Sequence, residues 1–441
     1  MDQMNNIDAI TQSQLCNGCG TCYSICPRSA ITIQKNAQLG VLTANVNADK
    51  CTNCGLCREV CHSDDIISGK QLMNIDLIGA YNGIYSGYSM DDALRYRASS
   101  GGIVSSLLRY LKTNSIIDGF VLIKPSTGSP LDYSAFISHD IDDILRYAGT
   151  RYFPIPVNMI LKELSQMNGK FVIIGTPCQI SALRKYEGRN KSLSEKILLR
   201  ISFFCGGVPN RNAYSYYMKA HGIDEQRVRS IYRGIGWPGN NVFEFDDGET
   251  ICISRRPKTF FAQIYHTLAF FPIFTQKRCL LCDDRFGVAS DISVGDAWLE
   301  EYKSDEMGTS LIISRSSTAR SILSDMQQEK AIFLRKATEE QLIQSQKIFS
   351  DYVSNYPTTC RVLLGRKYFN RHFGTEKSRS NPFWGMKITF INFGMKLTHV
   401  KRLWPYLFIY GIIFRYGYQW LSLAEQLRER VGRYFVVSVR K

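Results

Sequence analysis

The chain has 441 residues with 44% hydrophobic content, and a prior of roughly 150 residues per domain predicts two to four domains. Its formal charge of +15 favours acidic partners, such as nucleic acid, a membrane surface, phosphorylated ligands or an acidic redox protein. The first residues, MDQMNNIDAI, lack a basic region and an apolar core, which argues against a secretory signal, and fourteen cysteines in a reducing cytosol indicate metal or redox chemistry rather than disulfides.

Two cysteine runs share the spacing C-x2-C-x2-C-x3-C within the first predicted domain, residues 1–75. The runs are Cys16, Cys19, Cys22 and Cys26, then Cys51, Cys54, Cys57 and Cys61. This is the bacterial ferredoxin pattern, in which the fourth cysteine of each run ligates the [4Fe–4S] cluster of the other run. We therefore predict two clusters, one bound by Cys16, Cys19, Cys22 and Cys61 and the other by Cys51, Cys54, Cys57 and Cys26.

The alternative for these runs is a pair of zinc sites, because C-x2-C also suits tetrahedral zinc. Zinc sites rarely use three cysteines in tandem, so the duplicated spacing favours iron–sulfur clusters. His62 stands where the ferredoxin pattern usually has proline, a departure that removes no ligand. The residues between the runs alternate apolar and polar side chains, which predicts a β-hairpin.

A Gly-, Tyr- and Ser-rich stretch over residues 76–94 is interpreted as a linker. From about Arg95 to residue 350, helical patterns alternate with short apolar runs such as GFVLIK, KFVIIG and ISFFCGG, which predict buried strands. The predicted fold class is therefore α+β and α/β: a small ferredoxin-like domain, then a larger mixed α/β body and a basic helical C-terminal tail.

Cys178 lies in the most informative stretch of the body, KFVIIGTPCQISALRK. Thr176 and Gln179 form a T-x-x-Q capping box and Pro177 suits the first helical position, so Cys178 is predicted in the first turn of a helix. There the helix dipole favours a thiolate. Three more cysteines stand at loop-like positions, so a third metal site is predicted from Cys178, Cys205, Cys279 and Cys282. Spacing alone permits zinc or iron–sulfur there, whereas Cys252 and Cys360 are interpreted as structural.

Residues 376–441 form the tail, which carries twelve Lys and Arg against three acids. Its apolar run LWPYLFIYGIIF has twelve residues, fewer than the roughly 20 that a bilayer-spanning helix needs. Aromatic side chains beside basic ones suit a membrane interface. A basic helix pair packed on the body fits equally well, and both alternatives stay open.

Seven segments occur here in one order: ASSGGIVSSLL, GTRYFPIPV, GTPCQISALRK, FFCGGVPN, YRGIGWPG, RCLLCDD and SDISVGDAW. Over residues 8 to 315 the chain resembles the coenzyme F420 hydrogenase/dehydrogenase beta-subunit family. The resemblance implies a flavoprotein with FAD and [4Fe–4S] clusters. It also favours an iron–sulfur cluster over zinc at the third site. The resemblance also implies a role in surface-polysaccharide biosynthesis. We do not infer a deazaflavin substrate from it.

The implied flavin directs attention to eight residues. A helix start at Ser99, Ser100, Gly101 and Gly102 could bind a pyrophosphate, although serine capping and close glycine packing is the alternative. The other four candidates are Arg151, Tyr152, Thr176 and Gln179. GIGWPG matches G-x-G-x-x-G but lacks the following helix, so we reject it as a dinucleotide site. Asp291, Asp296 and Trp298 are interpreted as either substrate contacts or a capped turn.

The function predicted first is an iron–sulfur flavoenzyme in the cytoplasm, with peripheral contact at the inner face of the membrane as an option. A ferredoxin-like donor would load the clusters singly, and FAD would deliver electron pairs to an unknown small-molecule substrate. The second hypothesis is a non-catalytic electron-transfer subunit of a larger redox complex. A zinc-rich nucleic-acid binder is the third, and the ferredoxin spacing argues against it, so no nucleic-acid partner is expected.

Overall fold

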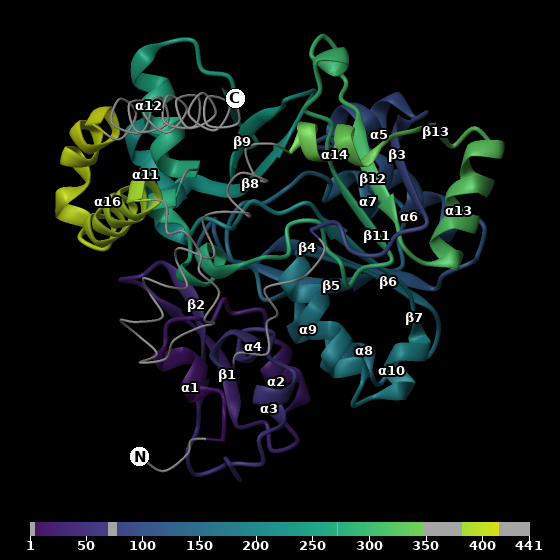
Figure 1. Ribbon diagram of the computed structural model, residues 1–441, viewed down its shortest axis with the longest axis horizontal. Coiled ribbons are helices and arrows are strands. Elements are labelled where there is room, and N and C mark those ends of the chain that lie inside the picture. Colours follow the sequence, from purple (N-terminus) through teal and green to yellow (C-terminus); the bar gives the residue numbers. More distant parts are fainter. Residues whose placement is uncertain (1–4, 69–76, 271, 347–381, 414–441) are drawn as a thin grey trace, which may run out of the picture.

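The computed structural model describes residues 5–68, 77–270, 272–346 and 382–413, with side chains in the last range from residue 389 (Figure 1). A small N-terminal domain lies below a larger mixed α/β body, as the fold-class prediction expects. Cys360 and the tail beyond residue 413 lie outside the described residues.

The N-terminal domain is a two-stranded hairpin surrounded by short helices. Its elements are α1 (Asp8–Gln12), α2 (Thr21–Ile25), β1 (Ile31–Asn36), β2 (Val41–Val46), α3 (Leu56–Glu59) and α4 (Asp64–Ile67). The two cysteine runs fold alike, because each turns at a left-handed glycine, Gly20 or Gly55, directly before α2 or α3. A β-carbon on Gly20 would lie 2.6 Å from the Met159 side chain of the body, so this turn requires glycine.

The body is built on one eight-stranded mixed sheet in the order β13-β3-β12-β11-β7-β6-β4-β5. Adjacent strands from β11 to β4 run parallel, and all other neighbours are antiparallel. The strands are β3 (Gly83–Ser89), β4 (Gly119–Pro125), β5 (Tyr133–Ser138), β6 (Phe171–Gly175), β7 (Ile197–Phe203), β11 (Ile292–Asp296), β12 (Ser310–Ser314) and β13 (Ile332–Lys336).

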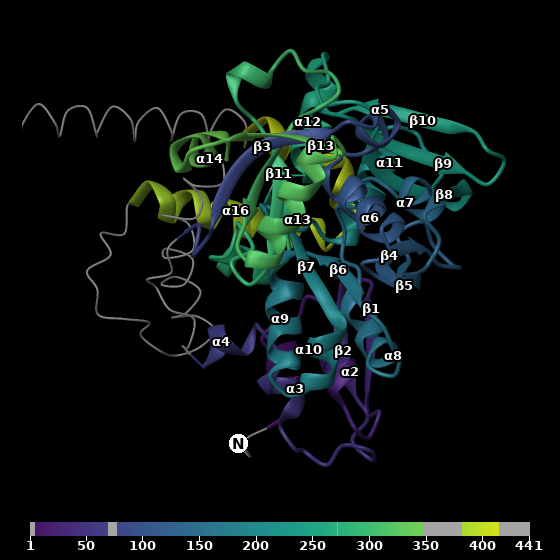
Figure 2. The same cartoon turned by 90° about the vertical axis from the view of Figure 1, so that its right-hand side faces the viewer.

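Helices cover both faces of this sheet. Val172 of β6 packs in the core under α6 and α13, whereas its neighbours Phe171 and Ile173 face α9 and the N-terminal domain. Figure 2 shows α9 and α10 beside that small domain. The helices of the body are α5 (Asp92–Arg97), α6 (Ile103–Thr113), α7 (Asp142–Arg146), α8 (Leu161–Leu164), α9 (Pro177–Glu187), α10 (Lys191–Lys196), α13 (Ser317–Gln328) and α14 (Glu339–Ser345).

A second, three-stranded antiparallel sheet packs with two helices beside the main sheet. It contains β8 (Val228–Gly234), β9 (Asn240–Phe245) and β10 (Thr250–Ser254), next to α11 (Arg211–Ala220) and α12 (Phe260–Phe270). GIGWPG is the turn between β8 and β9, with a cis bond from Trp237 to Pro238. A strand follows this glycine motif instead of a helix, which confirms its rejection as a dinucleotide site.

The predicted linker over residues 76–94 is wrong for most of its length. β3 lies inside the main sheet between β12 and β13, and α5 follows it directly. The glycine content has a packing reason, because a β-carbon on Gly87 would lie 2.2 Å from the Phe333 carbonyl oxygen of β13. Composition alone therefore led to a wrong prediction of a linker, where the chain forms a strand inside the sheet.

The described part of the tail packs on the body. It comprises α16 (Pro382–Thr398), the 3-10 turn η6 (Lys401–Tyr406) and helical residues 407–413. The Trp404 ring lies edge-on to Tyr216 of α11, and Gly411 approaches Leu268 of α12. For these residues, therefore, the tail packs on the body, which was one of the two alternatives. Within the described ranges, we find no helix with the length and apolarity that crossing a bilayer requires.

The two predicted domains share one hydrophobic core, which runs from Ile7 and Leu15 through α9 to α11 and α12. Fully buried Asn158, in the 3-10 turn η1 (Val157–Ile160), lies at their junction. Its amide donates to Thr21 Oγ1 at 2.9 Å and to the Gln179 carbonyl at 2.8 Å, and its backbone N–H donates to the Cys19 carbonyl at 2.9 Å. One residue therefore connects the ferredoxin-like domain with α9.

Candidate functional site

Two cavities in the N-terminal domain are each lined by four cysteines. One is lined by Cys16, Cys19, Cys22 and Cys61, and the other by Cys26, Cys51, Cys54 and Cys57. These are the two sets assigned to separate clusters from the spacing. The cavity around Cys54 lies nearer the solvent, because Cys54 is exposed whereas Cys19, Cys22 and Cys61 are buried.

Backbone N–H groups and a few side chains contact these sulfurs, among them Thr21 Oγ1 at 3.3 Å from Cys19 Sγ. Ala44 N–H donates to Cys16 Sγ at 3.4 Å, and Ala30 N–H donates to Cys26 Sγ at 3.3 Å. Burial raises the pKa of the Cys16 thiol to about 11 and that of Cys61 to about 12. Buried thiols with N–H donors aimed at them suit a bound cluster, whose irons replace the thiol protons.

The third set is assembled by the parallel strands. Because β6 and β7 are parallel neighbours, their carboxyl ends meet at one edge, which brings Cys178 after β6 near Cys205 after β7. Cys279 and Cys282 reach this edge from the 3-10 turn η4 (Lys277–Leu281). Burial and then Cys205, Cys279 and Cys282 raise the pKa of the Cys178 thiol, so the four sulfurs share one environment.

The predicted helix start at Cys178 is present, with Thr176 N–H donating to Gln179 Oε1 at 2.9 Å in the capping box. Burial raises the pKa of the Cys178 thiol well above its ordinary value, which opposes the predicted dipole effect.

Two buried arginines flank the third set, and sequence reasoning missed both. Arg278 is 5% exposed and Arg285 is 4% exposed, and Asp283 is one of the nearby groups that raise the Arg278 pKa. Arg278 Nη1 and Arg285 Nε are buried without a hydrogen-bond partner. Buried guanidinium groups need anionic partners, and a thiolate-bound cluster beside them would supply that charge. This observation supports a cluster at the third set.

The inner cavity and the third set are in direct contact. Asn17, between Cys16 and Cys19, donates its amide to Cys178 Sγ at 3.2 Å. Arg278 donates to Ser63 Oγ at 3.1 Å, two residues after Cys61. Burial lowers the Arg278 pKa, but nearby Cys282, Cys178 and Cys279 outweigh it and raise the pKa overall.

Within the described residues, no three His, Cys, Asp or Glu side chains are spaced to bind one metal ion together. In a [4Fe–4S] cluster each thiolate binds a different iron, so its ligands stand farther apart than those of a single ion.

The predicted flavin contacts at the start of α6 are engaged within the protein. Ser99 Oγ donates to the Arg233 carbonyl at 2.7 Å and accepts from Thr150 N–H at 2.7 Å. Ser100 Oγ donates to the Thr309 carbonyl at 3.1 Å, and Gly101 N–H donates to Ser310 Oγ at 3.0 Å. Gly102 adopts the left-handed turn before α6. These groups hold α6, β8 and β12 together, in agreement with the structural alternative.

The other four predicted flavin contacts also have internal partners. Arg151 Nη1 donates to three carbonyls at the end of α7, including that of Tyr147 at 2.6 Å. Gln179 Nε2 donates to the Ile155 carbonyl at 2.8 Å while its oxygen caps Thr176. Tyr152 OH accepts from Arg233 Nη1 at 2.9 Å. Most polar groups of the eight residues therefore have partners within the protein, whereas Arg151 Nε is buried without a hydrogen-bond partner, and the flavin contacts stay a prediction.

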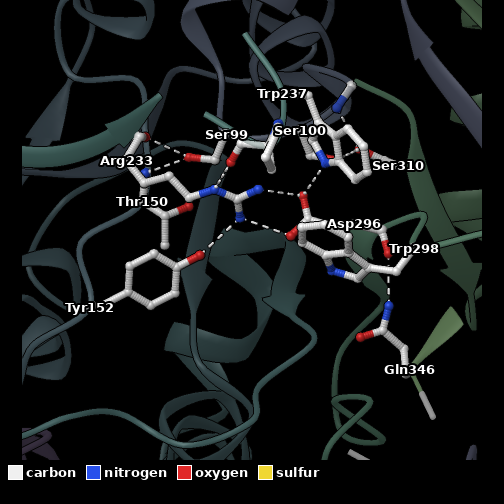
Figure 3. Close-up of polar contacts among 12 residues, drawn as sticks. Ser99, Ser100, Thr150, Tyr152, Arg233, Trp237, Asp296, Trp298, Ser310 and Gln346 are labelled. Atoms are coloured by element: carbon white, nitrogen blue, oxygen red, sulfur yellow. Dashed lines mark hydrogen bonds and ion pairs between the residues drawn. The ribbon is translucent and has the colours of Figure 1, made fainter. Parts of the chain in front are cut away.

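Arg233 and Asp296 form a buried ion pair that fixes the end of β11 (Figure 3). Both oxygens of the Asp296 carboxylate accept from the guanidinium, at 2.8 and 2.9 Å, and Trp237 Nε1 donates to one of them at 3.1 Å. Asp291 likewise pairs with Arg200 and Arg184. Both aspartates therefore belong to structural networks, in agreement with the capped-turn interpretation rather than the substrate-contact one.

Several buried polar atoms without hydrogen-bond partners lie next to Tyr152, the residue that accepts from Arg233. Arg255 Nη1, Tyr214 OH and His266 Nδ1 are buried without hydrogen-bond partners. The Arg255 guanidinium lies 4.9 Å from the Tyr152 ring centre and 5.5 Å from that of Phe270. Sequence reasoning missed this group because Arg255 follows β10 whereas Tyr214 and His266 come from α11 and α12, and no local motif links them.

Comparison with known proteins was made by family and by structure. Residues 84–162 match the family model described as "Coenzyme F420 hydrogenase/dehydrogenase, beta subunit N-term", and residues 168–340 match the companion model for the C terminus of the same beta subunit. Together these matches cover more than half of the chain. Residues 15–64 match a "4Fe-4S dicluster domain".

Two curated relatives are similar over long stretches. The chain is 26% identical over 274 residues to "Coenzyme F420 hydrogenase subunit beta" of Methanothermobacter thermautotrophicus, covering 60% of this chain and 87% of the relative. It is 24% identical over 392 residues to "Coenzyme F420-dependent sulfite reductase" of Methanocaldococcus jannaschii, covering 83% of this chain and 56% of the relative.

A solved structure shares the fold. It is a chain of the F420-reducing [NiFe] hydrogenase complex from Methanosarcina barkeri, with a TM-score of 0.52 and 20% identity. The match covers 67% of this chain and 97% of that one.

Proposed function

This chain belongs to the coenzyme F420 hydrogenase/dehydrogenase beta-subunit family and carries a 4Fe–4S dicluster domain, and we propose that it is an oxidoreductase with a linear iron–sulfur relay. Its redox role follows from the family and the dicluster domain. The order of the centres, the third cluster and the flavin belong to the proposal.

The order rests on exposure and contact. The outer cluster, at Cys51, Cys54, Cys57 and Cys26, would exchange electrons with a ferredoxin-like partner, because Cys54 is exposed. The inner cluster would receive them next, since its cavity holds buried Cys19 and Cys61. Asn17 and Arg278 then connect the inner site to the third set. This direct contact is the observation that carries the proposal.

The third cluster would be held by Cys178, Cys205, Cys279 and Cys282. Asn17 would donate to the Cys178 sulfur, and the two buried arginines would balance part of the negative charge. Both arginines come from segments that also contact Cys205 or the ferredoxin-like domain, which would fix their orientation.

We propose a flavin site beside Tyr152, at the unpartnered polar atoms of Arg255, Tyr214 and His266. A bound flavin supplies the exchange between one-electron and two-electron chemistry. Arg255 and Tyr214 would bind its polar groups, and the surrounding rings of Phe270 and Tyr217 would exclude water. The two curated relatives are named for coenzyme F420.

A carrier role is the second candidate. It is favoured by the engagement of all the sequence-predicted flavin contacts, apart from Gly102, in internal hydrogen bonds. In that case the chain would serve as an electron-transfer subunit, as its relatives' names as hydrogenase subunits suggest. We further propose that the protein contacts a membrane surface peripherally and acts in surface-polysaccharide biosynthesis. An exposed apolar surface in the tail supports the membrane contact.

The testing experiment measures iron, acid-labile sulfide and released flavin in anaerobically purified wild type, Cys279→Ser and the control Cys252→Ser. Three clusters predict about twelve irons, and Cys279→Ser is expected to retain about eight. Cys252 lies exposed on β10, so its variant should match wild type. About eight irons in wild type would overturn the third cluster, and no flavin would favour the carrier role.

A further inference from the structure

A short helix in the tail is apolar on both sides. Residues 403–414, LWPYLFIYGIIF, contain no charged side chain. Trp404, Leu407 and Tyr410 are buried against the body, whereas Ile409 and Ile413 are 57% and 54% exposed on the opposite side. A helix that is hydrophobic all round is normally covered on every side, and among the described residues nothing covers the outer side of this one.

The start of α12 extends the same surface. Phe261 is 60% exposed, and its ring stacks on Phe408 with centroids 5.2 Å apart. Tyr406, 65% exposed, precedes Ile409 by one turn. We call Phe261, Tyr406, Ile409 and Ile413 the apolar face. Its members come from two segments far apart in sequence, so the patch belongs to the folded protein rather than to one peptide.

The two segments that form the apolar face carry charge of one sign. Neither residues 250–282, which include α12, nor residues 377–424 contain a single Asp or Glu. The exposed charged groups of these segments are all basic, including Lys258, Lys396, Lys401 and Arg402. Such a surface attracts a negatively charged partner, and basic residues near a membrane surface each contribute about 1 kcal/mol toward anionic lipid.

We propose that the apolar face docks on the surface of an anionic lipid bilayer, which deepens the peripheral contact included in the proposed function. Exposed aliphatic and aromatic side chains ringed by Lys and Arg are the composition of interfacial helices, which lie in the bilayer surface. Residues 407–413 form about two turns, so they would lie in the interface rather than cross it. A protein partner would need acidic groups around an apolar groove, whereas a lipid surface supplies both features continuously.

The test is flotation of the anaerobically purified full chain with vesicles of phosphatidylcholine, with and without phosphatidylglycerol. Wild type is expected to float only with the anionic vesicles, and less as salt is raised. The double variant Ile409→Asp/Ile413→Asp should lose at least about tenfold in partitioning, since it places two charges in the interface. Lys401→Gln/Arg402→Gln should lose severalfold and become less sensitive to salt.

Ile116→Asp is the matched control, because Ile116 is 39% exposed and follows α6, which lies across the body from α12 and α16 in Figure 1, so its variant should leave flotation unchanged. Iron content of every variant reports on folding. Absence of wild-type flotation, or flotation unaffected by the double variant, would overturn the proposal, as would a wild-type dimer that the double variant converts to a monomer without lipid binding. Iron and sulfide in the same samples test the redox proposal separately, so either can fail alone.

Discussion

Arg278 is the residue that the proposed relay places between the inner and third cysteine sets. It is buried, it contacts Ser63 of the ferredoxin-like domain, and it neighbours three cysteines of the third set. A positive charge beside a cluster favours the reduced form, because reduction adds an electron to an already negative group. Its position between two centres would let one side chain adjust both potentials.

Arg278→Gln is expected to make the midpoint potentials of the inner and third clusters more negative. The change should correspond to roughly 1–2 kcal/mol, the effect of one charge at an effective dielectric constant of about 20. Redox titration followed by electron paramagnetic resonance measures both potentials. Arg278→Lys keeps the charge and should restore most of the shift. Equal potentials in wild type and Arg278→Gln would contradict the assignment.

His266 predicts a pH dependence of stability. Burial, then Arg255 and His221, lowers the pKa of His266 to about 3, whereas an unfolded histidine titrates near 6.5. The unfolded chain therefore binds the proton first, and stability that is complete above pH 6.5 is lost as the pH falls toward 3. At pH 5 the loss is about 2 kcal/mol.

The check is the thermal unfolding midpoint of wild type and His266→Phe at pH 7 and pH 5. Phenylalanine suits this aromatic site beside Phe270 and Tyr217. The variant should show a smaller fall between the two pH values. A fall as large as in wild type would assign the acid sensitivity to other groups.

At the scale of elements, local patterns predicted structure where the cause was local. The capping box at Thr176 and Gln179 fixed the start of α9 and the place of Cys178, and repeated spacing fixed which cysteines of the two runs line each cavity. β3 was missed because its identity as a strand comes from pairing with β12 and β13, more than 200 residues later.

The candidate site shows the same limit. Ser99 and Ser100 look like a phosphate-binding helix start, but their partners Arg233 and Thr309 come from distant segments that sequence reasoning could not place beside them. Arg278 stands next to Cys279 in the sequence, yet only the docking of the ferredoxin-like domain shows that it lies between two sets of cysteines.

At the scale of the whole molecule, we expect Asn158 to contribute to the free energy of unfolding through the junction between the two domains. Asn158→Leu keeps the size of the side chain but leaves the buried Gln179 carbonyl and the Thr21 hydroxyl without their donor. We expect a loss of about 2–4 kcal/mol, at about 1–3 kcal/mol for each unsatisfied group. Urea unfolding under anaerobic conditions measures it. Exposed Asn114→Ala is the control, and a similar midpoint in both variants would contradict the role of Asn158.

The continuous core across the domain junction also governs how electrons can travel. A carrier domain on a flexible tether delivers charge by swinging between distant docking points, and its turnover then depends on tether length and solvent viscosity. Here the small domain is packed against the body, and Asn17 already contacts the sulfur of Cys178. The intervals between centres are set when the chain folds, so transfer inside this protein would proceed at a fixed spacing and would be insensitive to viscosity.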